Sequence, residues 1–198
     1  GVDYHTAMIV GAIVIIGYTV LGGFLAVSTT DLIQSIVMSI ALVVIVFFGI
    51  QQAGGWDVVM QNASALPGYL NLARGHNMAT GEASTYGALS IVSTLAWGLG
   101  YFGMPHILLR FMAIRDENKL KISRRIASVW VVISMFVAIL IGIIGYSVSL
   151  NGKIPVFSSS AESETVIVQL AGLLSRHGVF FALAAGVVLA GILACTMS

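Results

Sequence analysis

Charge is scarce in this sequence, and this scarcity limits the class of protein that it encodes. Charged residues make up 9% of the 198 residues, against about 25% in soluble globular domains. The formal net charge is +1, so the composition gives no support for a nucleic-acid partner. The single cysteine, Cys195, leaves no possibility of a disulfide within the chain.

Motifs of soluble enzymes are also missing. The sequence contains no CxxC, HExxH, phosphate-binding loop or nucleophile-elbow pattern. We therefore predict that the protein is not an enzyme and uses no organic cofactor.

Hydrophobic residues dominate what is there. They make up 58% of the chain, and glycine occurs 22 times, while the mean hydropathy is +1.00. Abundant glycine within apolar segments is typical of transmembrane helices. We predict an all-α polytopic membrane protein, with residues 1–198 forming a single membrane domain in contact with the lipid bilayer. The absence of an initial Met and an ending inside an apolar run predict a fragment of a longer chain.

Several uncharged or nearly uncharged stretches have the length of about 20 residues that crosses a bilayer. They are residues 6–23, 32–50, 86–109, 127–150 and 179–198. Continuous apolarity without alternation favours helices over barrel strands. Gly22 and Gly23, followed by a polar run that ends at Asp31, predict a turn and a helix N-cap between the first two spans. Short helices near residues 56–62 and 164–174 are predicted within the longer polar segments.

The basic residues predict the orientation of these spans. Six of the nine basic residues lie in or beside one short connection, residues 110–126. Positive charge marks cytoplasmic loops, so this connection is predicted to be cytoplasmic. The two longer loops, residues 51–85 and 151–178, are then extracytoplasmic.

The third span contains the most informative stretch, AWGLGYFGMPHILLRFMAI, at residues 96–114. Each glycine weakens a helix by about 1 kcal/mol relative to alanine, and the internal proline weakens it by about 3 kcal/mol. Membrane proteins tolerate such interrupted helices where the freed backbone groups line a cavity. Trp97, Tyr101 and Pro105 recur every four residues and share one face of a continuous helix. Aromatic rings near the bilayer midplane suggest a transporter substrate site. The alternative is that both rings fill helix–helix interfaces.

Other polar residues also have structural alternatives. His106 fits either a proton relay or a neutral histidine bonded to a facing helix. Asp31 fits an N-cap carboxylate or a transient cation stop near a cytoplasmic exit. Small residues in the last span fit close helix packing, whereas the Ser198 hydroxyl with a backbone carbonyl fits a hard-oxygen site for Na⁺.

Three ordered motifs resemble the sodium/solute symporter family, and in particular its bacterial proline-transporting branch. Residues 18–34 resemble the YTxxGGFxAVxxTDxxQ signature of that family. Residues 96–114 are similar to the AWGLGYFGQPHIxxRFMAI run of the branch, and residues 186–198 look like the start of its sodium-site helix, ALAAILAAxMST. The resemblance extends over essentially the whole chain.

The resemblance implies part of a LeuT-like inverted-repeat fold, with five transmembrane helices corresponding to core helices four to eight. It implies a multi-pass protein of the bacterial plasma membrane that couples Na⁺ influx to proline uptake by alternating access. Trp97, Tyr101 and Pro105 match positions implicated in the substrate pocket. Ser198 matches a Na⁺-ligating hydroxyl, Cys195 a Na⁺-ligating backbone carbonyl, and Asp31 an aspartate associated with Na⁺ exit.

Two departures from the pattern leave alternatives open. Met104 stands where the branch usually has glutamine, so another small amino acid is an alternative substrate. The hydroxyl residue expected after Ser198 and core helices one to three, nine and ten lie outside this sequence. We therefore expect the missing helices of the full-length chain to be required partners. A sensory membrane domain of a signalling protein such as a histidine kinase is the alternative function.

Overall fold

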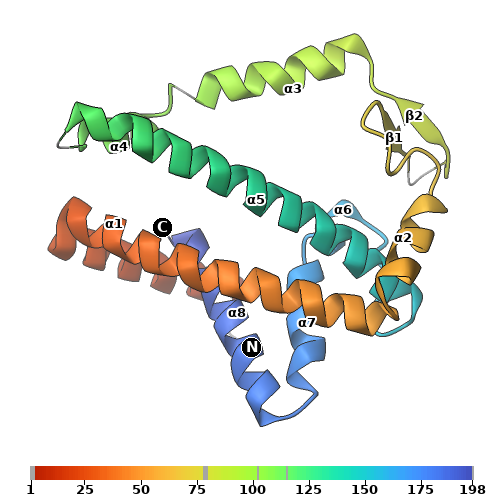
Figure 1. Cartoon of the computed structure of the whole chain (residues 1–198). Helices are drawn as coiled ribbons and strands as arrows, with labels where there is room; N and C mark the ends of the chain where they lie inside the picture. The colour runs from red at the N-terminus through yellow and green to blue at the C-terminus, as the bar shows by residue number, and fades with distance from the viewer. Residues whose placement is uncertain (1–2, 78–79, 102, 115, 198) are drawn as a thin grey trace. The chain divides into compact units, whose positions relative to one another are not determined.

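The computed structural model describes residues 3–77, 80–101, 103–114 and 116–197, and the chain is mostly helical. It divides into two compact units. Gly1–Trp56 and Val137–Ser198 form the first unit, and Asp57–Phe136 forms the second. The helices and strands carry the labels of Figure 1.

The first unit is built on α1, Tyr4–Ala53, which contains both of the first two predicted spans. Its backbone is interrupted at Gly23, where φ is 62° and ψ is −167°, so two helical segments meet at a kink. This conformation is essentially restricted to glycine. The predicted turn therefore reduces to a single residue, and the predicted N-cap at Asp31 is wrong. Asp31 lies inside the second helical segment, which continues directly after Gly23.

Two further helices, α7 (Val166–Ser175) and α8 (Val179–Met197), form a hairpin that packs against α1 (Figure 1). The C-terminal part of α5 (Glu117–Leu150) completes this core. Most of its largest fully buried side chains are aliphatic, which suits close helix packing. They include Ile45, Ile141, Ile144, Val148, Leu170 and Leu174. A helix near residues 164–174 is thus confirmed, but it packs into the core instead of lying on a surface.

The second unit begins inside α2, which spans Trp56–Ser64 and confirms the helix predicted near residues 56–62. A short antiparallel hairpin follows, β1 (Arg74–His76) and β2 (Ala83–Thr85), with Gly75 opposite Ser84. This hairpin corrects the purely α prediction. The unit continues with α3 (Ala88–Tyr101), α4 (Pro105–Met112) and the first part of α5. A four-residue helix, α6 (Ser160–Ser163), lies in the first unit between α5 and α7.

Apolar side chains remain exposed along most of these helices. Among the residues that the structure describes, two helices are long and apolar enough to cross a membrane, His5–Ala53 and Glu117–Leu150. Shorter apolar helices cover Ala88–Tyr101, Val166–Ser175 and Val179–Leu193. No residue of α3 is buried. Large exposed apolar surfaces of this kind are rare on soluble monomers, and they fit a chain whose helices contact lipid or further protein.

Candidate substrate and ion sites

The predicted third span is two helices, α3 and α4, with a break between them. Near the break, the Gly103 N–H donates to the Gly100 carbonyl at 3.1 Å, and the Met104 N–H to the Tyr101 carbonyl at 3.3 Å. Met104 is extended, with φ −71° and ψ 129°, and it precedes Pro105 at the start of α4. Proline favours an extended residue before it and fits the first turn of a helix because it needs no N–H partner there.

Trp97 and Tyr101 form a pair at the end of α3. Their ring centroids are 5.9 Å apart and the ring planes are inclined by 41°. The side chains are 73% and 45% exposed, so the pair presents its rings outward. Aromatic faces of this kind can pack against an aliphatic ring and attract an ammonium group.

Pro105 does not continue the face formed by Trp97 and Tyr101. The predicted alignment of all three residues assumed one continuous helix, whereas Pro105 begins a new helix after the break. Pro105 therefore determines where the helix restarts, and the structure brings together only the two aromatic residues of this set. His106 follows in α4, but its side chain lies outside the described part of the structure.

The predicted ion residues belong to the first unit. In α8, a Cβ built on Gly191 would lie 3.8 Å from a side-chain atom of Val37 and 3.9 Å from the Cα of Met38. Gly191 thus marks where α8 approaches the second segment of α1. Cys195 follows one turn later in α8. The Cys195 side chain and all of Ser198 lie outside what the structure describes, so their predicted role stays a prediction.

Asp31 lies in α1 and is half-buried. Gln34 follows three residues later, on the same side of the helix, and is also half-buried. Its Oε1 atom is buried and accepts no hydrogen bond from the described residues. Gln34 is the last residue of the motif at residues 18–34. Its burial is a tertiary property that no local pattern predicts.

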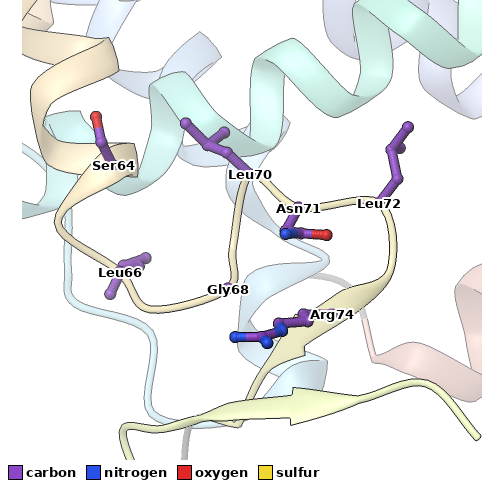
Figure 2. Close-up of a pocket in the computed structure, with 7 residues that line it drawn as sticks. All are labelled: Ser64, Leu66, Gly68, Leu70, Asn71, Leu72 and Arg74. Carbon is purple, nitrogen blue, oxygen red and sulfur yellow. The ribbon is translucent and has the colours of Figure 1, made fainter.

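A hollow of about 620 Å³ lies in the second unit, between the end of α2 and the start of β1 (Figure 2). Its lining mixes leucine side chains with the Arg74 guanidinium and the Asn71 amide. The lining residues are Ser64, Leu66, Gly68, Leu70, Asn71, Leu72 and Arg74. None of them comes from α3 or α4, so this hollow is separate from the aromatic pair. Groups of three or more metal-ligating side chains are absent from the described residues.

The sequence comparisons identify the family. The family model "Sodium:solute symporter family" matches residues 1–198. The chain belongs to this family. The sodium/proline symporters of Staphylococcus aureus strains USA300 / TCH1516, JH9 and Newman are each 34% identical to it over 199 residues. No solved structure gives a significant match.

These symporters cover the whole chain, but the chain spans only 35% of their length. The resemblance stated from the three sequence motifs is thereby confirmed. Membership in a symporter family also agrees with a membrane transporter instead of an enzyme. The exposed apolar helices are compatible with membrane spans, as membership in this family of integral membrane proteins requires.

Proposed function

We propose that this chain is the central part of a Na⁺-coupled symporter that carries proline or a related small amino acid into a bacterial cell. The family match over the whole chain is the observation that carries this proposal. Relatives named sodium/proline symporters, 34% identical to the chain, support the choice of substrate. Another small amino acid is the alternative substrate, because Met104 stands where the proline-transporting branch usually has glutamine.

The proposed architecture is part of a LeuT-like inverted repeat with five membrane spans, in a multi-pass protein of the plasma membrane. The break between α3 and α4 supports it, because discontinuous helices form the midplane sites of many secondary transporters. Helices outside this sequence would complete the bundle. In this arrangement, the exposed face of α3 packs against those helices and against the substrate.

The substrate in this proposal contacts Trp97 and Tyr101. Their rings are close enough to act as one surface, with centroids 5.9 Å apart. A desolvated ammonium group near such a surface gains about 2 kcal/mol from cation–π attraction. The aliphatic ring of proline would pack against the same faces, and Pro105 would fix the start of α4 beside them.

The coupling ion is assigned to the end of α8. The Ser198 hydroxyl and the Cys195 backbone carbonyl are hard oxygen ligands of the kind that Na⁺ uses, and Asp31 would mark the exit toward the cytoplasm. Coupling would be thermodynamic: Na⁺ favours the outward-open state that binds substrate, so each ligand raises the apparent affinity for the other.

The test is uptake of labelled proline by proteoliposomes that contain the full-length protein. We expect accumulation with an inward Na⁺ gradient and none with an equal K⁺ gradient. Ser198→Ala should raise the Na⁺ concentration needed for half-maximal uptake, whereas Ser175→Ala, at the exposed end of α7, should not. Proline binding without accumulation would contradict the transport proposal and favour a sensory domain. Na⁺-driven accumulation of a different amino acid would contradict only the choice of proline.

A further inference from the structure

A chain of hydrogen bonds joins three segments of the first unit at the C-terminal end of α1. Lys153, in the loop after α5, donates from Nζ to the Gln52 backbone carbonyl at 2.8 Å and to Gln52 Oε1 at 2.9 Å. Gln52 Nε2 lies 3.3 Å from Nε2 of His177, which occupies the turn between α7 and α8. His177 Nδ1 lies 3.0 Å from the carbonyl of Leu173. The chain thus ties the α7–α8 turn to α1.

The groups at the two ends of this series of hydrogen bonds, the Leu173 carbonyl and the Lys153 ammonium, determine the direction of every bond in it. The Leu173 carbonyl can only accept, so His177 Nδ1 must carry a proton. The Lys153 ammonium can only donate, so the amide of Gln52 must turn its oxygen toward Lys153. The amide nitrogen then faces His177 as a donor, and Nε2 must accept. The bond to Leu173 fixes a proton on Nδ1 and the bond from Gln52 requires a bare Nε2, so together they require the neutral imidazole.

Within the described part of the chain, the Leu173 carbonyl is the one acceptor that the His177 ring bonds, and two aromatic rings flank it. Phe48 of α1 and Phe181 of α8 contact the imidazole edge-on, with centroids 5.2 and 6.3 Å away. Two cations are close to His177. Lys153 lies on the other side of the Gln52 amide, and Arg176 precedes His177 in the sequence. His177 makes no ion pair with a carboxylate among the described residues. The side chain is exposed, so protons from solvent reach it.

We propose that Gln52, Lys153 and His177 form a pH-sensitive latch that holds the α7–α8 turn on α1. Imidazole changes charge between about pH 5 and pH 8. Protonation converts Nε2 from an acceptor into a donor that faces the donor nitrogen of Gln52. The amide cannot rotate to compensate, because rotation would turn its nitrogen toward the Lys153 ammonium. The latch is therefore closed when His177 is neutral and open when it is charged.

Amide hydrogen exchange of residues 176–182 tests this latch in the full-length protein in lipid nanodiscs. Exchange is measured at about pH 8 and about pH 5.5, and is corrected for the pH dependence of intrinsic exchange. We expect protection to fall by about threefold to tenfold at the lower pH, the effect of losing one hydrogen bond. Equal protection at both values would overturn the proposal. The readout needs neither substrate nor Na⁺, so it is independent of the proposed transport function.

Two substitutions test the direction of the bonds. Lys153→Met frees the Gln52 amide to rotate and accept from a charged His177, so the pH response should disappear. Gln52→Glu supplies a carboxylate that accepts from both cations, so protection should rise at low pH. The control, Arg176→Gln, removes the neighbouring cation outside the chain and should keep the wild-type response. A wild-type response in both Lys153→Met and Gln52→Glu would overturn the latch.

Discussion

Gly49 of α1 and Ile144 of α5 approach so closely that position 49 has no room for a side chain. A Cβ built on Gly49 would lie 2.5 Å from Ile144 Cγ2. Ile144 is fully buried. Its Cγ2 is attached directly to a branched Cβ, whose χ1 rotation is restricted. The two helices therefore cross where one of them carries glycine.

We predict that Gly49→Ala destabilises the protein by about 1–3 kcal/mol through overpacking. Thermal unfolding in detergent measures the change. Gly142→Ala in α5 is the matched control, because no atom lies within 4 Å of a Cβ built there. Adding Ile144→Leu, which removes Cγ2, should recover part of the loss in Gly49→Ala. An unchanged unfolding temperature for Gly49→Ala would contradict the close approach.

The kink in α1 gives a second prediction. Gly23 has φ 62° and ψ −167°, a region that costs other residues about 1–3 kcal/mol. Gly23→Ala should lower the unfolding temperature or straighten the helix, although the added methyl group meets no atom within 4 Å. Thermal unfolding measures the loss, and spin labels on the two segments of α1 report the angle. Gly17→Ala in the same helix, also without neighbours within 4 Å, should change neither.

The sequence predicts helices well here because apolar length is a local property. The interruption of the helix at Gly22-Gly23 and the weakened helix over residues 96–114 were also predictable from the sequence. Glycine and proline each alter the conformation of their own backbone. Asp31 is a position where the prediction from local sequence is wrong. A polar run after two glycines resembles a cap, but the helix restarts at once after Gly23 and leaves Asp31 in its interior. The β1–β2 hairpin was missed because three-residue strands carry too little pattern to detect.

The candidate sites were predictable only in part. Four-residue spacing correctly paired Trp97 with Tyr101, because both lie in α3. The same spacing failed for Pro105, since the helix breaks before it. The latch residues Gln52 and Lys153 are 101 positions apart. No periodicity within one helix predicts a contact that depends on how several helices pack.

Glu162 gives a prediction about pH. The backbone N–H and hydroxyl of Ser158 both donate to its carboxylate, at 2.8 and 2.9 Å, and these bonds lower the pKa of Glu162 below the usual 4.5. A lowered folded-state pKa means that the bonds stabilise residues 158–163 above the unfolded-state pKa. This stabilisation is lost as pH falls through the folded-state value. The Ser158 amide resonance should therefore shift with a midpoint below 4.5, as measured by NMR in the full-length protein.

Two variants serve as the checks on this interpretation. Glu162→Gln should abolish the acid transition at Ser158, because the carboxylate that titrates is gone. Glu164→Gln should leave the transition in place, since no side-chain hydrogen bond of Glu164 is found among the described residues. Persistence of the transition in Glu162→Gln would assign it to another group.

The aromatic pair gives the prediction that bears most directly on transport. Trp97→Ala in the full-length protein should raise the KM for proline by about tenfold or more, the effect of losing a desolvated cation–π contact and its packing. The Na⁺ concentration for half-maximal uptake, measured at saturating proline, should change little because we propose that the ion binds at the end of α8, away from Trp97 in sequence. Initial rates of labelled proline uptake at varied proline and varied Na⁺ separate the two effects.

Leu99→Ala is the matched control for Trp97→Ala. Leu99 lies two residues further along α3, on a different face, and is 74% exposed, against 73% for Trp97. Both variants remove a large apolar side chain from the same helix, so a general effect on packing or insertion would appear in both. A loss confined to Trp97→Ala therefore locates the substrate on the face shared with Tyr101. Equal losses in proline and Na⁺ affinity for Trp97→Ala, or equal losses in the two variants, would instead assign Trp97 to helix packing.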